Sequence, residues 1–336
     1  MAMVMNSTLP SVQMHTARSQ IGLKSFANSV YILGIVNNFA ALGYLYGSES
    51  APKNLRHSLM LKSLAFNDLL AVLGMWIQMN SALVFPSIKK TRWFCIIRVI
   101  WRSFGLGSGC IVCVMAVDRW IALTRPFFYQ KYITAGHIKK AILGLWLTDF
   151  GLVCLPFFGF GLYYRADKLE CVRYKHADSP VEKAYALLYM VFGTLLCCCL
   201  VVCNIAVMRS LTTQKKAQAK NKKVLIRRIS KNQDLTASAC TNEEVAFARL
   251  MVLLCGVFLV CWLPQVITVP VALMIGQANC NWFINLADII LAIHFVINPY
   301  FYVLQKWKWL TGLCKRKVNS RGNSVKTTTN EDLVTL

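Results

Sequence analysis

The sequence predicts an all-α membrane protein in which seven helices cross the bilayer as one bundle. Of its 336 residues, 56% are hydrophobic and only 15% are charged, whereas soluble domains carry about 25% charged residues. Seven apolar stretches are long enough for the roughly 20 residues that a bilayer core requires. The basic residues behind the net charge of +23 fall between these stretches, which indicates lipid headgroups rather than nucleic acid as their partners.

The apolar pattern sets the expected domain boundaries. The expected spans are 25–47, 58–83, 95–124, 139–163, 185–209, 245–275 and 282–304. An N-terminal tail at 1–24 precedes the seven-helix domain at 25–304, and a short amphipathic helix eight with a cytoplasmic tail follows at 305–336. The first twenty residues contain no apolar core, so we expect the first helix to act as the insertion signal. No internal repeat is visible, which argues against a transporter.

Positive charge predicts the orientation of the chain. The segment 209–231 holds nine Lys or Arg residues, and such segments stay on the cytoplasmic side. With seven spans the N-terminus is then extracellular, and we expect a multi-pass protein of the plasma membrane. Asn6 lies in an Asn-Ser-Thr glycosylation acceptor on the outer side. Lys89, Lys90, Arg92 and Arg173 would form a basic outer rim.

Several polar residues and prolines lie inside the apolar stretches, where each needs a physical reason. Asp68 indicates either a cation site or a carboxyl that is protonated or hydrogen-bonded to a neighbour. Asp118 and Arg119 end the third span, where the arginine could simply anchor the helix at the membrane surface. Pro264 and Pro299 each remove a backbone hydrogen bond from a helix, and the resulting kinks serve either packing or hinge motion.

An ordered set of motifs resembles the rhodopsin-like (class A) G-protein-coupled receptors over residues 25–315. The set comprises Asn38, Leu64-Ala65 with Asp68, Asp118-Arg119-Trp120, Trp146, Cys261-Trp262-Leu263-Pro264 and Asn298-Pro299 with Tyr302. The resemblance implies activation of a heterotrimeric G protein, with receptor kinases and arrestin as further partners. It also implies a disulfide between Cys95 and Cys171 and an ionic lock between Arg119 and Glu244, although Glu244 could instead be a solvated residue at a helix start.

The same resemblance implies further sites. Asp68, Ser108 and Asn298 would hold an allosteric Na⁺, the only ion or cofactor that we expect. Cys314 is either palmitoylated or a free cytosolic thiol. Thr327, Thr328 and Thr329 would be phosphorylated to recruit arrestin.

A narrower likeness is to the prostanoid receptors, and within them most to prostaglandin E receptors. It rests on the segments 113–120 and 125–129, on Pro156 and on Ala184-Tyr185. The departures indicate either a divergent member, for example from an invertebrate, or a relative with another ligand. That family binds the ligand carboxylate with an Arg in the outer half of helix seven, where this chain has Asp288 and Ile289. Its second-loop Thr-Trp-Cys is Leu169-Glu170-Cys171 here, and its Asp-Pro is Asn298-Pro299.

Other functional classes fit the sequence less well. The five histidines are scattered and there is no Gly-x-Ser-x-Gly motif, so we expect no enzyme and no metal centre. An amine ligand would require a carboxylate in the outer half of helix three, and 98–102 contains none. A peptide, a nucleotide or another small carboxylic acid remains as an alternative ligand.

Arg98 and Arg102 are candidate anchors for an acidic ligand because their i, i+4 spacing places them on one face of helix three. A buried Arg requires a partner. That partner is either the carboxylate of a lipid acid, bound through two parallel hydrogen bonds, or Asp288 of helix seven. The ligand body would lie against Trp101, Gln78, Met79 and Phe283. The sequence therefore predicts a receptor for an anionic lipid mediator, with prostaglandin E2 as the expected ligand and a rise in cAMP as the response.

Overall fold

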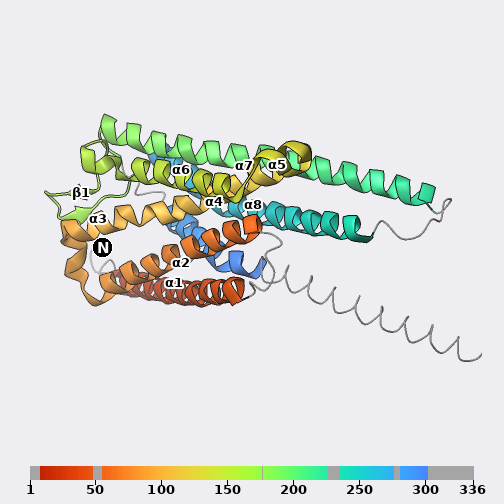
Figure 1. Ribbon diagram of the computed structural model, residues 1–336. Coiled ribbons are helices and arrows are strands. Elements are labelled where there is room, and N and C mark those ends of the chain that lie inside the picture. Colours follow the sequence, from red (N-terminus) through yellow and green to blue (C-terminus); the bar gives the residue numbers. More distant parts are fainter. Residues whose placement is uncertain (1–7, 48–54, 176, 226–234, 276–280, 302–336) are drawn as a thin grey trace, which may run out of the picture.

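The computed structural model describes residues 8–47, 55–175, 177–225, 235–275 and 281–301, which form one helical bundle (Figure 1). The elements are α1 (Thr8–Gly47), α2 (Leu55–Val84), η2 (Pro86–Lys90), α3 (Arg92–Ile100), α4 (Arg102–Thr124), α5 (Pro126–Tyr132), α6 (Ala135–Cys154), η3 (Leu155–Phe158), β1 (Tyr164–Arg165), β2 (Glu170–Cys171), α7 (Pro180–Leu225) and α8 (Leu235–Ile275). A last helix follows at Asn281–Phe301.

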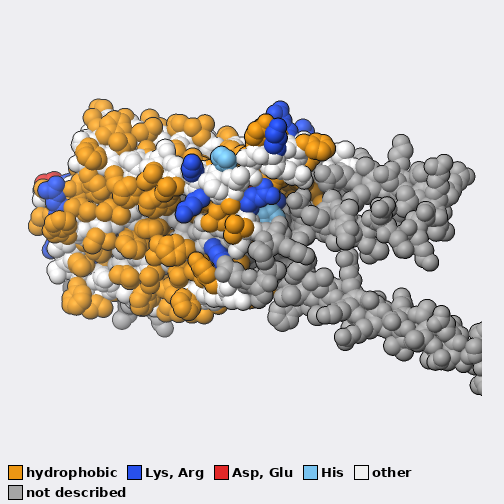
Figure 2. All heavy atoms as spheres, viewed as in Figure 1, with side chains coloured by type: hydrophobic (Ala, Val, Ile, Leu, Met, Phe, Trp, Pro, Cys, Tyr) orange, Lys and Arg blue, Asp and Glu red, His pale blue; other side chains and the backbone are white. Residues whose placement is uncertain are grey.

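Seven of these helical segments are long and apolar enough to cross a membrane, which confirms the predicted architecture. They are Gly22–Gly47, Leu55–Val84, Arg92–Thr124, Ala135–Phe158, Pro180–Thr213, Ala248–Ile275 and Asn281–Phe301. Hydrophobic side chains cover most of the flank of the bundle that Figure 2 shows, as contact with lipid tails requires. The expected amphipathic helix at 305–314 lies outside the described residues.

Several spans differ in detail from the prediction. The helix α1 already begins at Thr8, within the expected N-terminal tail at 1–24. The fourth, expected to reach residue 163, ends at Phe158, because Pro156 lies in the η3 turn and Gly159 adopts a left-handed φ of 89°. The third is divided between α3 and α4, with Trp101 at the junction. In addition, α7 continues to Leu225, so part of the basic 209–231 segment is helical.

The helix α4 forms the centre of the bundle. Of the apolar stretch within Arg92–Thr124, 78% is buried. The corresponding share is 22% for the stretches within Gly22–Gly47 and Ala135–Phe158. Its buried residues Leu106, Cys110 and Met115 belong to one core cluster with Leu200 of α7 and Phe258 of α8. Because α4 is surrounded by other helices, its side chains can reach a site inside the bundle.

Buried polar residues connect helices that are distant in sequence. The Asn38 side chain of α1 donates to the carbonyl of Gly34 at 2.9 Å and to that of Phe295 in the last helix at 2.8 Å.

Two prolines, Pro264 and Pro270, lie inside α8, and only the first was singled out from the sequence. Each removes a backbone donor, which makes this part of α8 a natural position for a bend.

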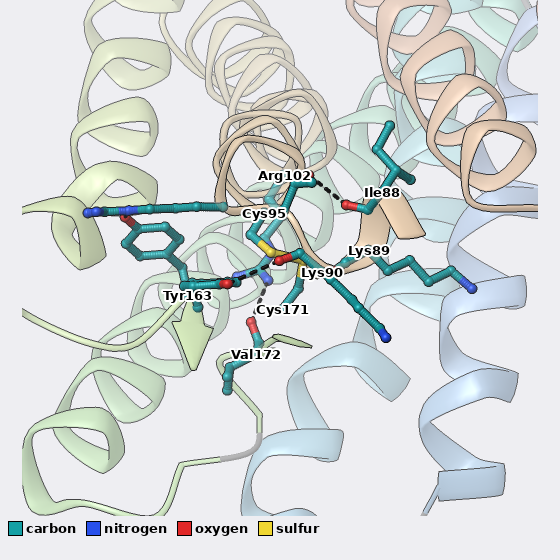
Figure 3. Close-up of a disulfide and its surroundings, with 11 residues drawn as sticks. Ile88, Lys89, Lys90, Cys95, Arg102, Tyr163, Cys171 and Val172 are labelled. Atoms are coloured by element: carbon teal, nitrogen blue, oxygen red, sulfur yellow. Dashed lines mark hydrogen bonds between the residues drawn. A yellow bond between two sulfur atoms is a disulfide. The ribbon is translucent and has the colours of Figure 1, made fainter. Parts of the chain in front are cut away.

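A short hairpin covers one end of the bundle, which we call the hairpin end. Tyr164 pairs with Cys171 and Arg165 with Glu170 in antiparallel register. The disulfide between Cys95 and Cys171 attaches this hairpin to α3, as the sequence predicted, and Figure 3 shows it close to Lys89 and Lys90. The opposite end, which carries α5, is called the α5 end.

Candidate functional site

A cavity of about 870 Å³ lies inside the bundle at the hairpin end. It is lined by α1, α2, η2, α3, α4, α8, the last helix, and the β1–β2 hairpin with the loop that follows it. Six of the seven predicted ligand residues line it, namely Gln78, Met79, Arg98, Trp101, Arg102 and Asp288. Leu106, Trp262 and Phe295 also contribute. The structure therefore brings these six residues together at one cavity, and their role in ligand binding stays a prediction.

Phe283, the seventh predicted ligand residue, is not among the residues that line this cavity. Its ring lies 5.9 Å from that of Trp282. Phe283 and Asp288 are five positions apart, which corresponds to about 140° around a helix. The two side chains therefore lie on different faces of the last helix, and only that of Asp288 reaches the cavity.

The cavity lining has a strong excess of positive charge. Eight of its residues are basic, Lys24, Lys89, Lys90, Arg98, Arg102, Lys168, Arg173 and Lys175, and two are acidic, Glu170 and Asp288. A concave surface lined by one sign of charge attracts ligands of the opposite sign. The chemistry of the lining therefore favours an anionic ligand over an amine.

Arg102 makes only weak contacts with the rest of the described chain. Its guanidinium lies 5.4 Å from the Tyr174 ring centre, and Nη2 is 3.5 Å from the carbonyl oxygen of Val172 (Figure 3). The salt bridge to Asp288 that the sequence left open does not form in this structure, because Asp288 has other partners. Within the described part of the chain Arg102 therefore has no carboxylate partner, and it remains available to a ligand.

The partners of Asp288 come from the loop after β2 and from α8. Arg173 Nη1 lies 2.8 Å from Asp288 Oδ2, while Gln265 Nε2 donates to Oδ1 at 2.8 Å. Lys175 Nζ lies 3.5 Å from the same Oδ1 and donates to Gln265 Oε1 at 2.5 Å. Burial lowers the pKa of Lys175 to about 8, although Asp288 acts in the opposite direction. We call these four residues the Asp288 cluster.

Trp101 forms the α2 side of the cavity wall. Its indole Nε1 donates to the Leu70 carbonyl at 2.8 Å, and its ring lies 5.3 Å from that of Phe104. Gly74 permits this approach, because a Cβ added there would lie 1.5 Å from Trp101 Nε1. The indole is thus held where the helix α3 gives way to α4, directly before Arg102.

Aromatic contacts lead from the cavity toward the membrane interior. The Trp262 ring stacks on that of Phe258 at 5.2 Å, and Phe258 meets the His294 ring edge-on at 5.4 Å. One helical turn further, Asn298 Nδ2 donates to Asp68 Oδ2 at 2.7 Å and lies 3.3 Å from His294 Nε2. The predicted hinge and the predicted cation site are therefore joined by a short series of contacts.

The three residues of the predicted sodium site carry oxygens that could bind a cation. Asp68 Oδ1, Ser108 Oγ and Asn298 Oδ1 are buried and have no hydrogen-bond partner among the described residues. One carboxylate, one hydroxyl and one amide oxygen form a donor set that suits a hard cation. The residues present therefore fit the ion that the resemblance implies.

Asp118 and Arg119 form a buried polar cluster near the α5 end. Arg119, which is 2% exposed, donates from Nε and Nη2 to Asp118 Oδ2 and from Nη2 to the Tyr129 hydroxyl at 2.8 Å. That hydroxyl donates to Asp118 Oδ1 at 3.0 Å, and burial raises the pKa of Tyr129 to about 12. Tyr129 completes the cluster, a role that the sequence motif alone did not give it.

Some predicted residues cannot be placed. The side chain of Glu244, which belongs to α8, and the residues Asn6, Tyr302 and Cys314 lie outside the described part of the chain. The lock between Arg119 and Glu244, the glycosylation site and the palmitoylation site therefore remain predictions.

Comparison with known proteins defines the class of the protein. Residues 46–302 match the family described as 7 transmembrane receptor (rhodopsin family). The chain therefore belongs to the rhodopsin family of seven-transmembrane receptors, which is a family of receptors rather than of enzymes. As the motifs indicated, it is a receptor of the G-protein-coupled class.

Several relatives are prostanoid receptors at low identity. The human prostaglandin D2 receptor is 27% identical over 170 residues, 48% of this chain and 47% of the relative. The prostaglandin E2 receptor EP3 subtype of Oryctolagus cuniculus is 22% identical over 326 residues, 87% of this chain and 75% of the relative. The chain spans about half the length of the prostaglandin D2 receptors that it matches. The squid rhodopsin crystal structure has the same fold, with a TM-score of 0.67, 18% identity and coverage of 87% of this chain and 86% of that one.

Proposed function

We propose that this receptor binds an extracellular anionic lipid mediator, with prostaglandin E2 as the first candidate, and that it activates a heterotrimeric G protein to raise cAMP. The observation that carries the proposal is Arg102, a half-buried guanidinium at the cavity that has no carboxylate partner in the described chain. A lipid carboxylate would accept two parallel hydrogen bonds from it. Arg98, one turn away, would add to the positive field.

The likeness to prostanoid receptors supports a ligand of this kind, although this chain lacks the Arg that those receptors have in helix seven. Arg102 would take over the role of that Arg from helix three. The apolar part of the ligand would then lie against Met79 and Trp101, above Trp262. The cavity volume of about 870 Å³ falls in the range of small-molecule sites. It favours a lipid over a long peptide, and another small carboxylic acid remains the alternative.

The proposal includes an orientation in the plasma membrane with the hairpin end outside the cell. A disulfide between Cys95 and Cys171 requires an oxidising compartment, and the nine basic residues of 209–231 favour the cytoplasm for the α5 end. Activation would bend α8 near Pro264 and open the polar cluster around Arg119 to the G protein. Receptor kinases and arrestin would then bind the cytoplasmic tail.

The experiment compares prostaglandin E2 with its uncharged methyl ester on cells that express the receptor, with cAMP as the readout. The wild type should respond to the acid at about 100-fold lower concentration than to the ester, because only the acid forms a charge-assisted pair. Arg102→Gln should remove this difference. Arg92→Gln is a matched control, since Arg92 also lies on helix three but bonds to the Tyr163 hydroxyl outside the cavity lining.

Two results would overturn the proposal. In the first, the wild type responds equally to acid and ester, which leaves no role for a carboxylate. In the second, neither compound acts, while peptides or small water-soluble carboxylic acids raise cAMP or calcium at equal surface expression.

A further inference from the structure

The Asp288 cluster joins three parts of the receptor that are distant in sequence. The carboxylate belongs to the last helix, Gln265 to α8, and Arg173 and Lys175 to the loop after β2. All four side chains line the cavity. Asp288 itself is 41% exposed, whereas Lys175 is only 4% exposed at its side chain. One carboxylate is thus surrounded by donors at the wall of a site that holds eight basic residues and only one other acidic residue, Glu170.

This arrangement resembles what an acidic ligand would require. A ligand carboxylate would be recognised by a guanidinium, an ammonium group and an amide N–H, and these are the groups that now hold Asp288. Gln265 directly follows Pro264, the residue at which α8 lacks a backbone donor. Its hydrogen bonds at 2.8 Å to Asp288 and 2.5 Å to Lys175 therefore connect the hinge region of α8 to the last helix and to the loop.

We propose that Asp288 is an internal competitor for acidic ligands, which holds Arg173, Lys175 and Gln265 in the ligand-free receptor and thereby keeps α8 in its inactive position. A ligand carboxylate bound at Arg102 uses its remaining lone pairs to attract Arg173 and Lys175, which line the same cavity, away from Asp288. Gln265 then loses its carboxylate partner, and α8 is released at Pro264. The affinity part of this inference rests on the proposed lipid-acid ligand, but the effect on α8 does not.

Two anions, the Asp288 carboxylate and the ligand carboxylate, compete for one group of cations. Binding of the ligand must break the contact of Asp288 with Arg173, so the ligand-free contact lowers the apparent affinity. Conversely, any change that breaks the contact without a ligand shifts the equilibrium toward the active state. Both effects stem from one coupling, and couplings of this kind commonly amount to between about 5-fold and 150-fold.

The test uses full-length receptor in cell membranes at equal surface expression. Ligand-free activity is measured as nucleotide exchange on a panel of G proteins, and affinity is measured with prostaglandin E2. Asp288→Asn should raise ligand-free exchange about threefold and the affinity for the acid about tenfold. Arg173→Gln breaks the same contact from the loop side but removes a cation, so ligand-free exchange should rise while the affinity for the acid does not.

Asp178→Asn is the matched control. It breaks a bridge of similar length, 2.7 Å to Arg165, in the same loop, but Asp178 does not line the main cavity. Both readouts should stay at the wild-type value.

Ligand-free exchange at the wild-type level in both Asp288→Asn and Arg173→Gln would overturn the inference. If the Asp288→Asn variant does not reach the cell surface, ligand-free exchange in Arg173→Gln alone tests the inference. Raised exchange in these variants without any response to prostaglandin E2 would support the role of Asp288 and contradict the proposed ligand instead.

Discussion

At the scale of single residues, Asp149 of α6 differs from the other buried carboxylates. It is 0% exposed, and neither of its oxygens has a hydrogen-bond partner among the described residues. Asp68 and Asp118, by contrast, accept hydrogen bonds from Asn298 and from Arg119 with Tyr129. The family motifs pointed to Asp68 and Asp118 only, so Asp149 was not singled out from the sequence. An unpartnered polar group in a membrane interior is costly.

We therefore expect Asp149→Leu to stabilise the receptor. The change removes two unsatisfied oxygens and keeps the number of side-chain heavy atoms and the branching at Cγ, and a gain of about 1 kcal/mol would raise the melting temperature by roughly 2 to 4 °C. The measurement is thermal unfolding of the detergent-solubilised protein. Thr148→Val is the control, because Thr148 is exposed and bonds only to the Gly144 carbonyl; its effect should be close to zero. A lower melting temperature for Asp149→Leu would show that the carboxyl has a stabilising partner.

The proposed ligand residues differ in how far the sequence could predict their positions. The i, i+4 spacing predicted one helix face for Arg98 and Arg102, and both side chains line the cavity. No such pattern points to Lys175 or Gln265. Lys175 enters the bundle from an irregular loop, and its partners depend on how that loop folds back under the disulfide, which no periodic pattern encodes.

At the scale of elements, the seven spans followed from hydropathy because apolar length is the main requirement of a bilayer. What hydropathy could not show was the junction at Trp101 within helix three. That junction depends on a contact with another helix, since the indole lies across Gly74 of α2 and donates to Leu70. Helix ends were likewise less predictable, and Pro156 with Gly159 ended the fourth span early.

The contact between α2 and Trp101 gives an element-scale prediction. Gly74→Ala should lower the melting temperature of the solubilised receptor by several degrees, because the new methyl group overlaps the indole and overpacking costs about 1 to 3 kcal/mol. Trp101→Ala should be less harmful in the Gly74→Ala background than in the wild type, which a double-mutant cycle measures. Gly144→Ala, which meets open space on α6, should have little effect. Independent, additive effects of the Gly74 and Trp101 variants would disprove this contact.

At the scale of the whole molecule, the ligand cavity and the polar cluster near the α5 end lie at opposite ends of α4. Between them, the contacts run from Trp262 through Phe258 and His294 to Asn298 and Asp68. A cation bound at Asp68 would interact with the middle of this series. We propose that Na⁺ binds Asp68, Ser108 and Asn298 and stabilises the inactive arrangement of the helices.

Linkage then requires that Na⁺ and an agonist oppose each other, each lowering the affinity of the receptor for the other. We expect about 150 mM NaCl to weaken agonist binding several-fold relative to the same concentration of KCl, which controls for screening of the basic cavity. Asp68→Asn removes the carboxylate charge but keeps a side chain of similar size, so agonist affinity in this variant should be the same in both salts. Agonist competition binding on membranes measures the effect. Equal affinities in NaCl and KCl for the wild-type receptor would contradict the sodium site. A sodium effect that persists in Asp68→Asn would show that the ion acts elsewhere in the molecule.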